Sequence, residues 1–131
     1  MKTFNRVKTG LSISFGGTRV NFNNISFLKI LNKGAKFLEA EIYWKYKAAT
    51  KKEPIRLKNN YSTFKLFHEY SLFNLNNYYI NINEILFIKD KKIYNGEIDE
   101  IHLEIVFKNG LIIREVITLN EWEFIRSNFL G

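Results

Sequence analysis

The chain has 131 residues, a mass of 15.6 kDa and a formal net charge of +7. This length is typical of one domain, and 46% hydrophobic residues exclude a wholly disordered protein. No apolar run approaches the roughly 18 residues of a membrane span, and the first residues lack the apolar segment of a secretory signal. The absence of cysteine excludes disulfides and thiolate chemistry. We therefore expect a cytoplasmic protein with a single domain over 1–131.

The first half of the chain is predicted to form strands followed by one helix. Residues 7–23 alternate apolar and polar side chains around Gly16-Gly17, which predicts a hairpin. Further strands are expected over 25–31, 37–47 and 55–58. The even positions of the 37–47 strand, which include Trp44 and Tyr46, form an apolar face that we expect in the core. Aromatic residues near helical spacing then predict a helix over 61–73.

The second half repeats this order, with strand patterns first and a helix last. Strands are expected over 78–82, 85–89, 101–107 and 111–118. A charged loop is expected over 90–97, and Asn109-Gly110 is a strong signal for a two-residue hairpin turn. Asn120, with Glu123 three residues later, predicts the start of the final helix, and Trp122 lies on its apolar stripe.

Two stretches of the halves also match residue by residue. The first match has a constant offset of 60 and relates Asn21, Asn23, Ile25, Phe27 and Lys29 to Asn81, Asn83, Ile85, Phe87 and Lys89. The second has an offset of 63 and relates 41–45 to 104–108. These matches predict a duplicated unit, with internal repeats over 7–73 and 78–130. The expected fold is α+β: two β4α-like repeats, with roughly eight strands in antiparallel sheets and two helices sharing one core.

Charge is distributed unevenly between the halves. Residues 1–60 carry 13 Lys and Arg against 3 Glu, a balance of +10, whereas residues 61–131 carry 7 basic and 10 acidic side chains, a balance of −3. Such asymmetry indicates a surface for a polyanion. Lys, Asn and Ile together account for 48 residues, and their codons are A/T-rich, so an AT-rich bacterium or its phage is the expected source. A lysine-rich face that has no partner is therefore an open alternative.

The segments 27–29, 37–45 and 54–58 place a basic strand, an acidic and aromatic strand and a short basic strand before a helix, and 117–122 repeats the strand-to-helix ending. This order resembles the Whirly, Pur-alpha and positive-cofactor-four group of single-stranded nucleic-acid-binding proteins. The resemblance implies that the chain binds single-stranded DNA or RNA. The acidic second half departs from the two basic repeats of that group, so we expect binding through the first half.

Binding of single strands needs cations for the phosphates and flat side chains on which bases stack. Tyr43 is expected on the outward face of the 37–47 strand, where it is either a stacking platform or an ordinary half-exposed strand aromatic. The predicted nucleic-acid-binding residues are Lys29, Lys33, Lys36, Tyr43, Lys45, Lys47, Lys51, Lys52, Arg56 and Lys58. Glu39 and Glu41 lie on the same face and would repel phosphate.

Residues for catalysis are sparse. His68 and His102 have no metal-ligating partner at useful spacing, and Asp90 and Asp99 both fall within the loop region 90–100. We therefore expect no enzymatic activity, metal or cofactor. The main alternative is a small phage-type inhibitor or accessory protein that binds an acidic protein surface or a nucleoprotein complex. No membrane partner is expected, and a homo-oligomer is compatible with the sequence.

Overall fold

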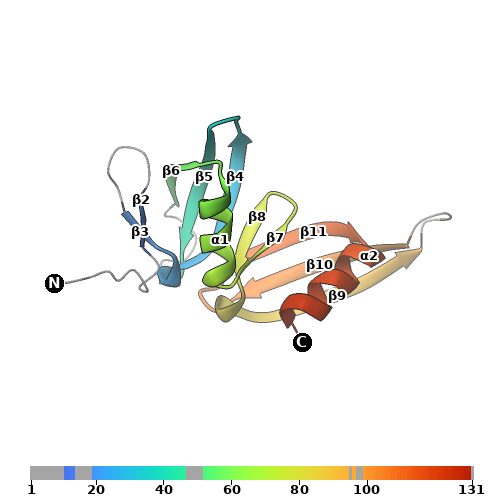
Figure 1. Cartoon of the computed structure of the whole chain (residues 1–131). Helices are drawn as coiled ribbons and strands as arrows, with labels where there is room; N and C mark the ends of the chain where they lie inside the picture. Colours follow the sequence, from blue (N-terminus) through green and yellow to red (C-terminus); the bar gives the residue numbers. More distant parts are fainter. Residues whose placement is uncertain (1–10, 14–18, 47–51, 95, 97–98, 131) are drawn as a thin grey trace.

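The computed structural model describes residues 11–13, 19–46, 52–94, 96 and 99–130 (Figure 1). The protein is α+β, and its described residues form one antiparallel sheet of five strands, another of three, a separate two-stranded hairpin and two α-helices. The strands of the two larger sheets run in different directions, and each sheet has one helix against one of its faces.

The first sheet is built mainly by the first half of the chain. In chain order, this part of the chain forms β2 (Leu11–Ile13), β3 (Arg19–Asn21), the 3-10 helix η2 (Phe22–Asn24), β4 (Ile25–Lys33), β5 (Phe37–Trp44), β6 (Lys52–Lys58), α1 (Tyr61–Glu69), β7 (Leu72–Leu75) and β8 (Tyr78–Asn81). The strand order is β6-β5-β4-β8-β7, whereas β2 and β3 pair with each other in a sheet of their own. The β7–β8 hairpin therefore extends the sheet that β4, β5 and β6 begin.

The second sheet is built by the rest of the chain. Its elements are the 3-10 helix η3 (Ile82–Glu84), β9 (Ile85–Tyr94), β10 (Asp99–Phe107), β11 (Ile112–Thr118) and α2 (Leu119–Ile125), and a π-helical turn over Arg126–Leu130 follows. The strand order is β11-β10-β9. The turn predicted at Asn109-Gly110 joins β10 to β11, and Gly110 has a φ of 94°, a conformation that glycine adopts without steric cost.

The first helix is shorter than predicted. We expected it over 61–73, but α1 ends at Glu69, because Ser71 adopts a positive φ of 63° and the chain reverses there. Leu72, Phe73 and Leu75 instead belong to a strand that pairs with β8, and all three residues are buried there. The aromatic spacing was misleading because Phe73 faces the core from a strand.

Other element boundaries also differ from the predictions. β5 ends at Trp44, and Tyr46 is 62% exposed rather than in the core. β9 continues to Tyr94 through most of the predicted charged loop, because β10 pairs with it over that length. Thr118, not Asn120, caps α2. The Thr118 side chain accepts a hydrogen bond from the Glu121 backbone N–H, and the Glu121 carboxylate accepts one from the Thr118 backbone N–H.

Two hydrophobic clusters hold the fold together. One lies between α1 and the first sheet and includes Leu28, Ile42 and Phe67. The larger one combines side chains of both sheets and α2, listed in part as Phe27, Phe73, Leu75, Ile80, Ile105, Phe107, Trp122 and Ile125. The burial predicted for Trp122 is confirmed, with 7% of the residue exposed. The two sheets are therefore fastened together by a shared apolar contact.

The two halves contain the same elements in the same order. A hairpin, a three-residue 3-10 turn, three antiparallel strands and a helix follow one another in each. Both 3-10 turns begin at an asparagine, Asn21 or Asn81, whose side-chain oxygen accepts a hydrogen bond from the backbone N–H two residues on, 3.0 Å away in each case. Descent of the halves from one duplicated unit stays a prediction.

Candidate nucleic-acid interface

The predicted binding residues whose side chains the structure describes do not form one continuous surface. Lys47 and Lys51 lie outside the described residues, and Lys52 is described only by its backbone pairing with Tyr43. The remaining seven are divided along β5, which at about 3.3 Å per residue separates its two ends by more than 20 Å. Lys33, Lys36 and Lys58 lie at one end, Lys29 and Arg56 lie on the sheet face, and Tyr43 and Lys45 lie at the other end.

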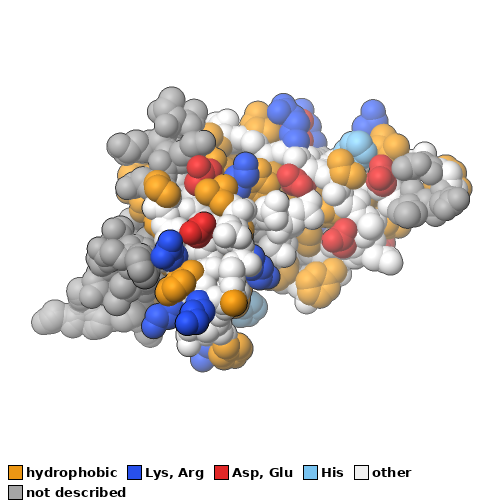
Figure 2. All heavy atoms as spheres, turned by 90° about the horizontal axis from the view of Figure 1, so that it is seen from above, with side chains coloured by type: hydrophobic (Ala, Val, Ile, Leu, Met, Phe, Trp, Pro, Cys, Tyr) orange, Lys and Arg blue, Asp and Glu red, His pale blue; other side chains and the backbone are white. Residues whose placement is uncertain are grey.

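The turn between β4 and β5 gathers the first group, which we call the lysine end: Lys33, Lys36 and Lys58. Lys58 stands opposite Phe37 in the sheet, and the Lys36 carbonyl accepts a 2.8 Å hydrogen bond from the Asn59 backbone. All three lysines are exposed. Figure 2 shows the molecule from above the view of Figure 1, which is the side on which this turn lies. Toward one end of that view, several Lys and Arg side chains lie near one another with few acidic side chains between them.

Backbone geometry holds this turn in shape. The Gly34 N–H donates to the Phe37 carbonyl across 2.9 Å, and the Asn59 side chain donates to the Gly34 carbonyl across 2.7 Å. A Cβ atom at Gly34 would lie 3.1 Å from the Phe37 carbonyl oxygen, so glycine permits this close approach. The lysine end is therefore presented on a braced turn.

A small pocket of about 200 Å³ adjoins the lysine end. Lys33 lines it together with Phe64 and Tyr79, and the lysine Nζ lies 5.7 Å from the centroid of the Phe64 ring. Asparagine amides complete the wall, from Asn32, Asn74, Asn76 and Asn77. Burial raises the pKa of the Tyr79 phenol above its ordinary value. The pocket is smaller than the roughly 300–1,000 Å³ of typical small-molecule sites, which suits a single ring.

The sheet face between the two ends is balanced in charge. Lys29 on β4 stands opposite Glu41 on β5, and Arg56 on β6 stands opposite Glu39. The Arg56 guanidinium lies 3.3 Å from the Glu39 carboxylate and 5.4 Å from the centroid of the Phe37 ring. Because each cation has a carboxylate neighbour across the strands, this face attracts phosphate less than the count of lysines suggests.

We expected the Tyr43 side chain on the outward face of its strand, but the structure does not leave this side chain free. Its ring stacks on Phe27 with centroids 4.4 Å apart, and Phe27 in turn packs on Phe107 of the second sheet. The Tyr43 hydroxyl donates to the Glu41 carboxylate across 3.1 Å. Burial, followed by this hydrogen bond and the charge of Glu41, raises the pKa of Tyr43 to about 12. One face of the ring is thus already covered, because the contact between the sheets needs it.

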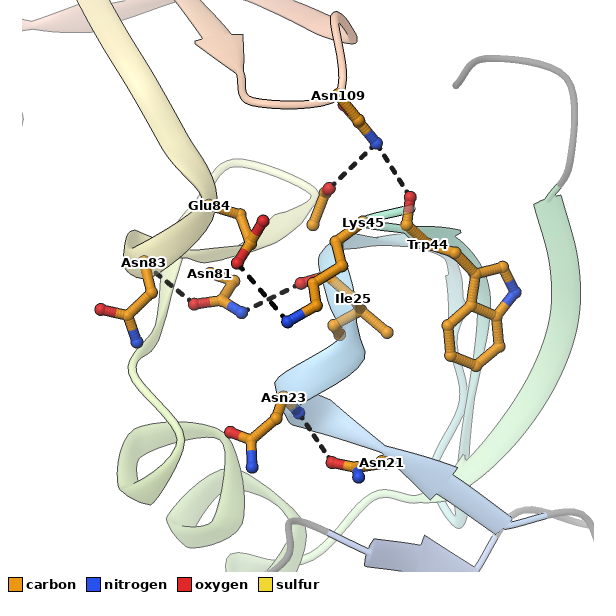
Figure 3. Close-up of polar contacts among 10 residues, drawn as sticks. Asn21, Asn23, Ile25, Trp44, Lys45, Asn81, Asn83, Glu84 and Asn109 are labelled. Atoms are coloured by element: carbon orange, nitrogen blue, oxygen red, sulfur yellow. Dashed lines mark hydrogen bonds and ion pairs between the residues drawn. The ribbon is translucent and has the colours of Figure 1, made fainter. Parts of the chain in front are cut away.

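Lys45 lies at the junction of the two halves, shown in Figure 3. Its ammonium is 3.9 Å from the Glu84 carboxylate, and its backbone N–H donates to the Asn24 carbonyl across 2.9 Å. Beside it, the Asn109 side chain donates to the Trp44 carbonyl across 2.9 Å. Lys45 therefore takes part in a polar contact between the halves, and it lies far from the lysine end.

A larger hollow lies elsewhere, on the uncovered face of the second sheet. It has a volume of about 750 Å³ and is lined by Lys89, Asp90, Lys91, His102, Leu103, Glu104, Arg114, Glu115 and Val116. Its wall contains one ion pair, with Arg114 3.4 Å from Glu104, and the His102 imidazole lies 3.7 Å from the Glu100 carboxylate. The alternation of 101–107 predicts which residues face outward here. It does not predict a hollow, because that depends on how the sheet twists.

Other classes of site find no support in the described parts of the chain. There, no three His, Asp or Glu side chains are placed to hold a metal ion, and neither α-helix is long and apolar enough to cross a membrane. Comparison of the chain with models of protein families, with curated proteins and with solved structures finds no match.

Proposed function

We propose that the protein binds single-stranded nucleic acid with little sequence preference, through the lysine end and the pocket beside it. The observation that carries the proposal is the gathering of three exposed lysines next to a pocket lined by aromatic rings and amides. Lysines supply salt-dependent attraction for phosphates, and the pocket offers a place for one base. The residues that matter most are Lys33, Lys36 and Lys58, with Phe64 and Tyr79.

The geometry narrows the binding surface expected from the sequence. Lys29 and Arg56 have carboxylates opposite them, and Tyr43 and Lys45 serve the junction of the halves. A strand of nucleic acid that ran along β5 would meet Glu39 and Glu41, which repel phosphate. A strand that crosses the end of the sheet, from Lys58 past Lys36 to Lys33, avoids both carboxylates.

The test is fluorescence anisotropy with a labelled mixed-sequence oligonucleotide, as DNA and as RNA, at about 50 and 200 mM salt. Lys33→Gln, Lys36→Gln and Lys58→Gln combined should lower the slope of log affinity against log salt by about 2, at roughly 0.7 per contact. The wild type should then lose about 20-fold more affinity than this variant over the fourfold rise in salt.

A matched control removes the same charge from exposed positions elsewhere, by Lys91→Gln, Lys108→Gln and Arg126→Gln combined. It should bind like the wild type. Equal weakening of binding in both triple variants would show that only net charge matters and would contradict the assignment to the lysine end. No binding by the wild type at the lower salt concentration would contradict the proposed function itself.

The competing function is binding of a protein. The alternation of Lys29, Arg56, Glu39 and Glu41 on the open sheet face favours it, because a surface with both signs of charge suits a protein better than a polyanion. If the oligonucleotide does not bind, this face becomes the first surface to test.

A further inference from the structure

β9 is an exposed edge strand. In the described structure it pairs with β10 and with no other strand. Apolar side chains are left open near its start, with Leu86 59% and Phe87 43% exposed. A long edge with unpaired backbone groups and exposed apolar residues is a template for another strand.

The equivalent strand of the first half is β4, and the correspondence is close. The Lys45 N–H donates to the Asn24 carbonyl at 2.9 Å, and the Lys108 N–H donates to the Glu84 carbonyl at 3.0 Å. Each strand also has an irregularity in its pairing at the same point. The positions concerned are Ile25/Phe27 and, through its partner strand, Ile85/Phe87. The pairing of β4 is therefore a guide to how β9 would be arranged if another strand covered the free edge of β9.

The edge of β4 is covered by β8. The register places Phe27 opposite Ile80, Leu28 opposite Tyr79 and Lys29 opposite Tyr78. The buried Asn81 side chain adds a 3.0 Å hydrogen bond from its amide to the Ile25 carbonyl. Phe27 is 4% exposed and packs in the cluster between the sheets, whereas Leu28 is 0% exposed and packs in the cluster under α1.

The hairpin β2–β3 corresponds to the hairpin β7–β8. Leu11 pairs with Asn21 in the first, and Leu72 pairs with Asn81 in the second, so the strands meet in the same register relative to the capping asparagine. The described parts of β2 and β3 pair with no third strand. In Figure 1 the hairpin lies beside the start of β4, on the side away from β9.

We infer that the β2–β3 hairpin of a second copy of this chain adds to the free edge of β9, as β7–β8 adds to β4. The internal register, moved by the offset of 60, places Val20 of the second copy opposite Phe87, and Arg19 opposite Ile88. The contact continues the existing sheet and buries the exposed Phe87.

The contact can be made twice between two copies. Each chain offers one free β9 edge and one unpaired hairpin, so reciprocal addition closes a two-fold dimer of twice 15.6 kDa. Addition in one direction only would give longer chains of the protein through the same contact. Both assemblies use the pairing of β3 with β9.

The first experiment measures mass by light scattering over a range of concentrations up to about 100 µM. The wild type should form dimers, or longer chains, that dissociate on dilution. Phe87→Lys should give a monomer with unchanged circular dichroism, because a charge on an edge strand opposes pairing and the side chain is already partly exposed. Val116→Lys is the matched control on β11, at 47% exposure, and should assemble like the wild type. A wild type that stays monomeric, or assembly that Phe87→Lys leaves intact, overturns the inference.

The second experiment tests the register, and the absence of native cysteine makes it clean. Directly opposite residues lie about 4.5–5.5 Å apart, within the range of a disulfide. Val20→Cys chains mixed with Phe87→Cys chains should form a mixed disulfide much faster than Val20→Cys chains mixed with Val116→Cys chains. Equal rates overturn the inference. One chain carrying both Val20→Cys and Phe87→Cys should cross-link between molecules; an intrachain disulfide in a monomer would assign the edge to the chain's own hairpin and overturn the second copy.

Discussion

β4 and β9 begin with the same sequence pattern and lie in different surroundings. Phe27 is 4% exposed and Phe87 is 43% exposed, although both stand at the same place after a capped 3-10 turn. The difference comes from neighbours distant in the sequence. β8 covers the edge of β4, and Tyr43 and Phe107 pack on the Phe27 ring, whereas no described strand covers the edge of β9. One local pattern thus specifies a strand twice, while the burial of that strand depends on the distant partners that reach its edge and its face.

The largest expected effect compares the two phenylalanines directly. Phe27→Ala should lower the free energy of unfolding by about 3–5 kcal/mol, because it empties the contact among Tyr43, Phe107 and Ile80. Phe87→Ala, measured on the monomer, should cost about 1 kcal/mol or less. Urea denaturation at low protein concentration checks both. Equal losses would mean that the two strands are buried alike.

The next effect compares the two capping asparagines. Asn81→Asp keeps the oxygen that caps η3 but removes the amide that donates to the Ile25 carbonyl, in a side chain that is 2% exposed. It should cost about 1–3 kcal/mol at pH 7. The introduced carboxyl should have a raised pKa because of its burial, so the loss should be smaller near pH 4, where its proton can serve as the donor.

Asn21→Asp is the control, and it should change stability by about 0.5 kcal/mol or less in the monomer. Denaturation of both variants at pH 4 and pH 7 makes the comparison. A loss for Asn81→Asp that does not depend on pH would contradict a buried donor role.

A smaller effect is expected at the tyrosine that joins the sheets. Tyr43→Phe keeps the stack on Phe27 and loses the hydrogen bond to Glu41, which should cost about 0.5–1.5 kcal/mol at pH 7. The pKa of Tyr43 is raised to about 12 in the folded protein, so the unfolded chain loses that proton first.

The wild type should therefore lose stability as pH rises from 10 toward 12, and Tyr43→Phe should lose less over that window. Part of the dependence should remain, because burial also raises the pKa of Tyr78 and Tyr79. Thermal unfolding of both proteins across this range is the measurement. Parallel curves would contradict the raised pKa of Tyr43.

The smallest effect concerns the two ends of β5. Lys45→Gln removes the ion pair with Glu84, which at this partial exposure should cost less than about 1 kcal/mol. It should leave oligonucleotide binding unchanged, whereas Lys36→Gln alone should weaken binding without affecting stability. If Lys45→Gln weakens binding as much as Lys36→Gln does, the binding surface extends along the strand.

The secondary structure was largely predictable from local patterns. Alternation over 101–107 and the turn at Asn109-Gly110 specify β10 and its return strand, because side-chain period and turn chemistry act within a few residues. The same reasoning failed at Phe73, where a helical spacing and a buried strand position give the same run of apolar letters. It also misplaced the cap of α2. Thr118 and Asn120 are both residue types that cap helices well, and in the structure the helix is capped by Thr118.

The candidate site was predictable as a composition and not as an arrangement. The excess of cations in residues 1–60 was plain from the sequence, but strand register decided that Lys29 and Arg56 face carboxylates while Lys33, Lys36 and Lys58 gather at one end. The packing of one sheet on the other made Tyr43, which was expected on the outward face of its strand, a residue of the contact between the sheets.

By itself, the sequence determined an α+β chain in which the same pattern of elements occurs twice, because periodicity, caps and turns are properties of short segments. Only the tertiary structure decided that β7–β8 joins the first sheet, that the halves share a core through Phe27 and Phe107, and that the edge of β9 is left open. Those outcomes depend on which distant strand reaches which edge. The choice of neighbouring strand is set by long-range packing, which a local sequence pattern does not specify.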